Sequence, residues 1–132
     1  MKKFDNFINS LGILKNADVK RIEEDEIYRT GVIGQFNLTF ELAWKALQAV
    51  LQLNGVAAAE TGAPREIVKL GYKYALVNDE PVWLDMLKDR NVSVHIYNED
   101  VVLEIINRII NSYIPAFEAF AKTMADKIKE LD

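Results

Sequence analysis

The sequence predicts an all-α protein, an antiparallel bundle of four to five helices that forms a single domain over residues 1–132. Apolar residues recur at steps of three and four over long stretches, which is the spacing of an amphipathic helix. Only 3 Pro and 6 Gly interrupt the chain, and no alternating strand pattern extends beyond a few residues. Half of the 132 residues are hydrophobic, which is enough to bury a sizeable core.

The longest predicted helix covers residues 26–53 and carries two apolar faces. The first face is made of Phe36, Phe40, Ala43, Leu47 and Val50. The second face is made of Leu38, Leu42, Ala46, Ala49 and Leu53. Glu41 and Lys45 lie in the polar third of this helix, where their spacing suits an i,i+4 ion pair. Because a helix with two apolar faces usually buries both, we expect the second face to contact another copy in a homodimer or higher homo-oligomer.

Amphipathic patterns also predict a helix over residues 4–14 and another that begins at Pro64. Proline suits the first helical position, because the N–H group that it lacks would have no partner there. Ile67, Leu70 and Tyr74 share one side of the helix that begins at Pro64. We therefore predict that these three side chains point into the core.

Two further helices are predicted, one beginning near Pro81 and one after Asn98. In the first, Trp83 and Met86 lie along one side, which predicts that both are buried. Asn98 is a good N-cap for the second helix, whose apolar stripe extends to the C-terminus. Pro115 lies within that stripe and is expected to kink or divide the helix.

The composition excludes several classes of function and location. The chain has no cysteine, so disulfides, thiol nucleophiles and zinc–thiolate sites are excluded. No apolar run approaches the ~18 residues that span a bilayer, and the N-terminus makes a poor signal peptide. We therefore expect a cytoplasmic protein that does not enter a membrane. A net charge of −4 argues against broad, sequence-independent binding to DNA.

Motifs for cofactors and metals are absent from the sequence. It contains no Gly-rich phosphate loop, no G-x-S-x-G and no paired-histidine motif. Asp85 and Asp89 are four residues apart, and we interpret them as part of a solvated helix face. We therefore expect neither a metal ion nor a cofactor.

A basic stripe occupies the polar side of the helix that begins at Pro64. Arg65, Lys69 and Lys73 recur at steps of four residues. The stripe fits an ordinary solvated face, and it also fits a strip that neutralises RNA phosphates. The sequence leaves both interpretations open.

The segment RNVSVHIY, residues 90–97, contains the only histidine of the chain. Four of its residues have a structural explanation. Arg90 would complement the negative end of its helix, and Asn91 would belong to the helix exit. His95 would be a polar turn residue, and Tyr97 would pack just before the next helix.

The same residues also fit a site for phosphate chemistry. His95 can act as a general base near neutral pH, and Arg90 can clamp two phosphate oxygens. Asn91 lies four residues before His95 and could orient the imidazole ring or the phosphate. This combination supports metal-independent cleavage of RNA, in which a 2′-hydroxyl attacks the adjacent phosphate.

Four blocks of sequence together carry a resemblance to a known family: TFELAWKALQAVL (39–51), APREIVKLGYKYAL (63–76), VWLDMLKDRN (82–91) and HIYNED (95–100). In order and spacing, they resemble the nucleotidyltransferase substrate-binding protein family of the HEPN superfamily, from about residue 33 to 113. The resemblance implies a helical bundle that forms homodimers or higher oligomers. It also implies a separate protein partner, a minimal nucleotidyltransferase.

In related HEPN toxins, the motif R-x4-H-x-Y is the ribonuclease site. The resemblance places this motif on Arg90, His95 and Tyr97, with Asn91 at a position that is commonly polar. In some such toxin–antitoxin pairs, the partner transfers AMP to the tyrosine of the motif. Tyr97 is therefore the candidate for adenylylation, which would block RNA through charge and bulk.

Three hypotheses follow from the sequence. In the first, the chain is the toxin half of a toxin–antitoxin pair, a HEPN-type partner of a minimal nucleotidyltransferase with metal-independent ribonuclease activity. In the second, it is a non-catalytic subunit that binds a nucleotide or substrate for that partner. In the third, it is an interaction bundle in which residues 90–97 only end one helix and begin the next. Gln35 and Asn37 depart from the family, because arginine and glutamate are expected at these positions.

Overall fold

The computed structural model describes residues 1–93 and 98–131, so His95 and Tyr97 lie outside the described residues. The described part of the chain is built from helices and contains no strand, which confirms the predicted all-α bundle. The α-helices are α1 (Lys2–Lys15), α2 (Val19–Glu24), α3 (Glu26–Leu53), α4 (Pro64–Lys73), α5 (Glu80–Ser93), α6 (Glu99–Arg108) and α7 (Ile114–Leu131). A short 3₁₀-helix, η1 (Ala57–Ala59), follows α3, and a π-helical segment, η2 (Ile109–Tyr113), joins α6 to α7.

The long helix α3 forms the centre of the bundle and has the bounds that the sequence predicts. Asp25 caps its N-terminus, because one carboxylate oxygen accepts hydrogen bonds from the backbone N–H groups of Ile27 and Tyr28 at 3.0 and 3.1 Å. The first apolar face is fully buried along its length. The second face is only partly covered, since Leu38 is 50% exposed and Leu53 is 65% exposed.

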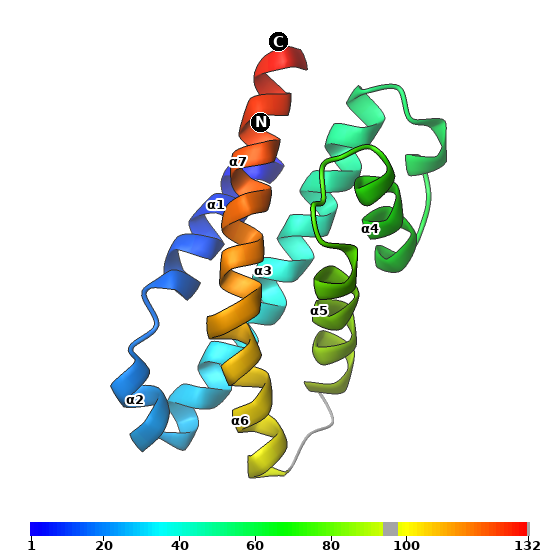
Figure 1. Cartoon of the computed structure of the whole chain (residues 1–132). Helices are drawn as coiled ribbons and strands as arrows, with labels where there is room; N and C mark the ends of the chain where they lie inside the picture. The colour runs from blue at the N-terminus through cyan, green and yellow to red at the C-terminus, as the bar shows by residue number, and fades with distance from the viewer. Residues whose placement is uncertain (94–97, 132) are drawn as a thin grey trace.

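The other long helices run beside α3 in alternating directions (Figure 1). In that view, α6, η2 and α7 follow one another as a single rod, with α1 and α5 on its two sides. Aromatic side chains from these helices meet in the core. Phe7 of α1 packs edge to face on Phe117, and Trp83 of α5 packs in the same way on Phe117 and Phe120.

The predicted interruption at Pro115 takes the form of the π-helical segment η2, which ends two residues before the proline. A proline inside a helix has no N–H group to donate and clashes with the preceding turn, so the regular α-helical pattern cannot continue unchanged. A π-helical turn accommodates such a break while the rod continues.

The structure corrects the predicted orientation of Tyr74. Ile67 of α4 is buried as predicted, but α4 ends at Lys73 and the Tyr74 side chain is 42% exposed. The chain reverses at Ala75, which has a positive φ of 61°. Because the helical spacing stops there, Leu76 and Val77 are buried in the core in place of Tyr74.

Candidate functional site

The last turn of α5 places Arg90 beside α3. The Arg90 Nη2 atom lies 2.8 Å from a carboxylate oxygen of Glu41, and each side chain is about one-third exposed. Arg90 Nη1 donates a second hydrogen bond of 3.2 Å to the amide oxygen of Asn91. These two contacts fix the orientation of the guanidinium group at the surface.

Glu41 is shared between three side chains. Besides Arg90, it pairs with Lys45 at 3.4 Å, which confirms the predicted i,i+4 pair, and it accepts a hydrogen bond of 3.0 Å from Trp44 Nε1. Two cations thus share one carboxylate, which leaves the cluster with a net positive charge. Pairs this exposed contribute less than about 1 kcal/mol each, so their main effect is on orientation.

Asp89, the residue before Arg90, lies on the core side of α5 and is only 6% exposed. Its carboxylate accepts hydrogen bonds from Arg108 Nε at 2.8 Å and from Arg108 Nη2 at 3.0 Å. It also accepts a hydrogen bond from the hydroxyl of Tyr113. The prediction of a solvated face is therefore wrong for Asp89, although Asp85 is exposed. Arg108 of α6 and Tyr113 of η2 cover Asp89, whereas Asp85, one turn earlier, faces the groove between α4 and α5.

Contact with the buried Asp89 carboxylate holds Tyr113 and Arg108 in defined protonation states. Burial, followed by the hydrogen bond to Asp89, raises the pKa of Tyr113 above its usual range, so the phenol stays neutral and donates its proton. The hydrogen bond to Asp89 also raises the pKa of Arg108, which therefore stays charged. The cluster is a bidentate ion pair with one neutral donor added.

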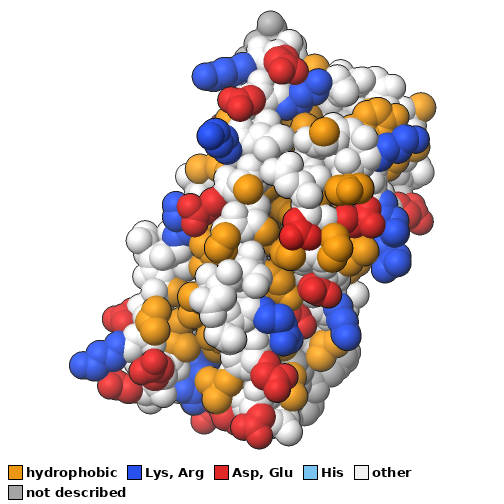
Figure 2. Space-filling model, in the orientation of Figure 1, with side chains coloured by type: hydrophobic (Ala, Val, Ile, Leu, Met, Phe, Trp, Pro, Cys, Tyr) orange, Lys and Arg blue, Asp and Glu red, His pale blue; other side chains and the backbone are white. Residues whose placement is uncertain are grey.

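A groove of about 680 Å³ lies between the beginning of α4 and the outer side of α5. It is lined by Ala63, Pro64, Arg65, Leu84, Asp85, Leu87, Lys88, Arg90, Asn91 and Val92. Three of these residues are cations and one is a carboxylate, so the lining is positively charged although the chain carries a net charge of −4. Figure 2 shows basic side chains in blue along the α4–α5 edge of the molecule, with acidic side chains between them.

The N-terminus of α4 opens into the same groove. Its N-cap residue, Ala63, has no side chain that could accept a hydrogen bond from the first turn. The N–H groups of Arg65 and Glu66 therefore keep their donor capacity, and the helix dipole adds a partial positive charge. Backbone donors at a helix N-terminus are a common element of sites for phosphate and other anions.

The structure brings some of the predicted site residues together and separates others. Arg65, Arg90 and Asn91 line one groove although Arg65 is far from the other two in sequence. Lys69 instead pairs with Glu80 at 3.7 Å, outside the groove lining. Lys73 lies over the ring of Tyr74, at 5.8 Å from its centroid. His95 and Tyr97 are outside the described residues.

Gln35 and Asn37, the positions where the resemblance leads us to expect arginine and glutamate, form internal contacts. Gln35 donates hydrogen bonds to the backbone oxygen of Ser10 at 3.1 Å and to its hydroxyl at 2.9 Å, which joins α3 to α1. Asn37 donates a hydrogen bond of 3.0 Å to the hydroxyl of Ser93, the last residue of α5. An amide at position 37 therefore fastens the end of α5 to α3, close to Arg90.

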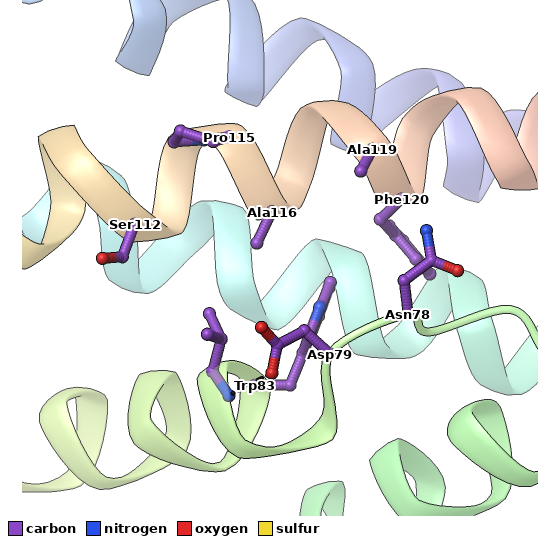
Figure 3. Close-up of a pocket in the computed structure, with 9 residues that line it drawn as sticks. Asn78, Asp79, Trp83, Ser112, Pro115, Ala116, Ala119 and Phe120 are labelled. Atoms are coloured by element: carbon purple, nitrogen blue, oxygen red, sulfur yellow. Dashed lines mark hydrogen bonds between the residues drawn. The ribbon is translucent and has the colours of Figure 1, made fainter.

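A second, smaller hollow of about 360 Å³ lies at the opposite end of α5 (Figure 3). The buried rings of Trp83 and Phe120 contribute to its lining, together with small residues of α7. Asp79 is its one carboxylate, and that carboxylate already accepts a hydrogen bond of 3.3 Å from the N–H of Val82. Among the residues that the structure describes, no cation and no predicted site residue lines this hollow, so the groove between α4 and α5 is the better candidate site.

Comparison with known proteins identifies the family. The sequence pattern of proteins described as nucleotidyltransferase substrate binding protein like matches residues 2–126. The chain belongs to this family. The predicted resemblance to nucleotidyltransferase substrate-binding proteins is thereby confirmed, and the family name associates the chain with a nucleotidyltransferase. Among the three hypotheses, the match favours a binding subunit over a ribonuclease.

The fold of this family member is also found in a solved structure. A crystal structure of a protein from Thermus thermophilus aligns with a TM-score of 0.65 and 27% sequence identity. The alignment covers 95% of this chain and 98% of that chain. The comparison with curated proteins gave no match. None of the helices in the described residues is both long and apolar enough to cross a membrane.

We predict that Tyr113→Phe destabilises the protein by about 1–3 kcal/mol at pH 7, because a buried carboxylate loses one donor. The folded-state pKa of Tyr113 is raised, so the stabilisation is complete below the unfolded pKa of about 10 and decreases above it. In urea unfolding, the difference in free energy of unfolding between the wild type and Tyr113→Phe should therefore be smaller above pH 10 than at pH 7. Tyr72→Phe, at a side chain that is 52% exposed, is the control and should have the free energy of unfolding of the wild type at both pH values. A constant difference across pH would contradict the prediction.

Proposed function

We propose that this chain is the binding subunit of a two-component nucleotidyltransferase, and that the groove between α4 and α5 holds the phosphates of a nucleotide. The observation that carries the proposal is the convergence of Arg65, Lys88 and Arg90 with the N-terminus of α4 around one groove of an acidic protein. The family match supplies the link to a nucleotidyltransferase. Transfer itself is assigned to the partner protein.

Arg90 is suited to hold a phosphate because it is already oriented. A guanidinium group has five N–H donors, and the contacts with Glu41 and Asn91 use two of them. The remaining donors can bind phosphate oxygens in a bidentate manner. Since Glu41 is shared with Lys45, it offsets only part of the positive charge.

Arg65 supplies the second half of the proposed site. It is exposed at the first turn of α4, and no carboxylate within the described ranges 1–93 and 98–131 pairs with it. A phosphate between Arg65 and Arg90 would also face the backbone donors of α4. Lys88 adds charge at the same groove, so a polyphosphate chain would contact more than one cation.

We expect Arg90→Ala and Arg65→Ala each to weaken the binding of ATP, measured by calorimetry without metal, by about tenfold, the loss of one charge-assisted hydrogen bond. Lys73→Ala is the matched control, because it removes the same charge from α4 at a position outside the groove. The affinity of Lys73→Ala for ATP should stay within about twofold of that of the wild type. Equal losses in all three variants would indicate a diffuse charge effect and would sink the proposed site.

The ribonuclease hypothesis makes a different use of the same region. In it, Arg90 is the phosphate clamp, His95 the general base, Asn91 the positioning residue and Tyr97 the target for AMP. The family match favours the binding subunit instead, and the pairing of Arg90 with Glu41 fits a preformed binding site. The ribonuclease hypothesis and the toxin–antitoxin pairing remain alternatives that an experiment can separate.

As a binding subunit, the purified chain should not cleave RNA without metal, under conditions in which a known HEPN nuclease does. His95→Ala should then match the wild type. Cleavage that disappears in His95→Ala would establish the ribonuclease hypothesis in its place. The mass of protein co-expressed with its nucleotidyltransferase gives a parallel measurement, since AMP on Tyr97 would support the toxin–antitoxin model.

We further propose that the second apolar face of α3 pairs two copies of the chain. Its side chains Leu38 and Leu53 are 50% and 65% exposed. Ile27, Gly31 and Gly34 extend this face toward the N-terminus of α3: Ile27 is 84% exposed, and an added Cβ at either glycine would meet nothing within 4 Å. The absence of side chains there leaves room for the close approach of another helix.

Sedimentation measurements should give the wild type a mass that is a multiple of 15.0 kDa, and Leu38→Glu should shift the mass toward that of one chain. A charge in a buried apolar interface is unfavourable because it must lose its water. Leu103→Glu is the control, since Leu103 has a similar exposure of 43% but lies on α6. A wild type that sediments as one chain would rule out the pairing.

A further inference from the structure

Two neighbouring residues of α5 are held by different parts of the bundle. Asp89 is bound by Arg108 of α6 and by Tyr113 of η2, whereas Arg90 is bound by Glu41 of α3. Neighbouring side chains on an α-helix point about 100° apart, so the two contacts restrain the same turn from two directions. The position of Arg90 at the groove therefore depends on both.

The π-helical segment η2 makes the contact with Asp89 possible. Arg108 and Tyr113 are five residues apart, and in an α-helix they would point about 140° away from each other. A π-helix closes its hydrogen bonds between residues five apart, which brings such a pair onto one side. The segment Ile109–Tyr113 is π-helical, and both side chains reach the same carboxylate.

Tyr113 forms a fixed end of this cluster. It is 1% exposed, and its ring stacks on Phe36 of α3 with centroids 5.2 Å apart and an interplanar angle of 20°. The hydroxyl that reaches Asp89 is thus held by the central helix as well as by η2. Through Tyr113 and Arg108, Asp89 is tied to the core of the bundle.

Stability alone gives a weak reason for such a cluster. The Asp89 carboxylate is buried, whereas the Arg108 side chain is 40% exposed. A buried charge loses its water, and replacing a buried ion pair by apolar side chains of similar volume is often neutral or stabilising. A carboxylate with directional hydrogen bonds fixes both the rotation and the register of the helix that carries it, which an apolar contact does not. On α5, the residue that follows this carboxylate is the arginine of the groove.

We infer that Asp89 is a positioning residue for Arg90. The hydrogen bonds that Arg108 and Tyr113 donate to the Asp89 carboxylate fix the last turn of α5, and this turn presents the Arg90 guanidinium group to the groove. The inference rests on the proposed function, because it assigns Asp89 to the same site. Asp89 itself does not line the groove and would not contact a bound nucleotide.

The first test follows the contact between Arg90 and Glu41 without any ligand. Trp44 donates its indole N–H to Glu41, so the indole resonance of Trp44 in a ¹H–¹⁵N spectrum reports on that carboxylate. We expect Asp89→Asn to shift this resonance and the Arg90 side-chain resonance. Glu104→Gln removes the same charge from an exposed position of α6 outside the groove lining and should leave both in place. Unchanged resonances in Asp89→Asn would overturn the inference.

The second test is a double-mutant cycle of ATP affinity with Asp89→Asn and Arg90→Ala. Asp89→Asn should weaken binding about tenfold in the wild-type background, the loss of one charge-assisted hydrogen bond to the ligand, and should add nothing once Arg90 is removed. Asp89→Asn removes a negative charge, and this change alone would strengthen the binding of an anion, as we expect for Asp85→Asn. Weaker binding of ATP by Asp89→Asn would therefore have to come from a displaced Arg90. Equal losses in both backgrounds would refute a role through Arg90.

Tyr113→Phe is the milder variant, used if Asp89→Asn does not fold, and it should show the same pattern with a smaller loss. The two proposals fail in different ways. If Arg90→Ala binds ATP as the wild type does, the proposed groove is wrong, while the resonance shifts still decide the positioning of Arg90. If Arg90→Ala weakens binding but neither Asp89→Asn nor Tyr113→Phe does, only the positioning inference is wrong.

Discussion

The burial of one complete face of α3 is the constraint on which the rest of the structure depends. Phe36, Phe40 and Leu47 are fully enclosed. Phe36 packs on Tyr113 of η2 and Phe40 packs on Trp83 of α5, so neighbours from different elements cover this face. Several helices must therefore pack around α3, and aromatic rings fill the space between them. Burial of apolar side chains drives this assembly, but the attraction has little directional preference.

Polar contacts supply the direction that apolar packing lacks. Asn37 joins α3 to the end of α5 through Ser93, and Asp89 joins α5 to the rod of α6 and η2. On the far side of residues 94–97, Arg29 lies 2.7 Å from Glu99 in the first turn of α6. The chain on both sides of the undescribed residues is thus fixed by specific side-chain contacts, and the groove at α5 has a defined shape.

Most of the fold follows from local signals in the sequence. The bounds of α3, the cap at Asn98 and the interruption before Pro115 were all predictable, because period, capping and proline chemistry involve residues close in sequence. The orientation of Tyr74 was not, because the helix ends one residue earlier and helical spacing no longer applies. Asp89 looked like a surface residue because its partners, Arg108 and Tyr113, come from a distant segment.

The sequence by itself determined the family, every long helix and most of the residues to consider, since these depend on local pattern and on blocks of residue types. It did not predict the short helix α2 or single out Lys88. The tertiary structure decided which of those residues meet. It brought Arg65 to the same groove as Arg90, left Lys69 and Lys73 outside that groove, and buried Asp89. These outcomes depend on which faces of different helices pack together. Such packing is set by the whole core, so no local stretch of sequence contains it.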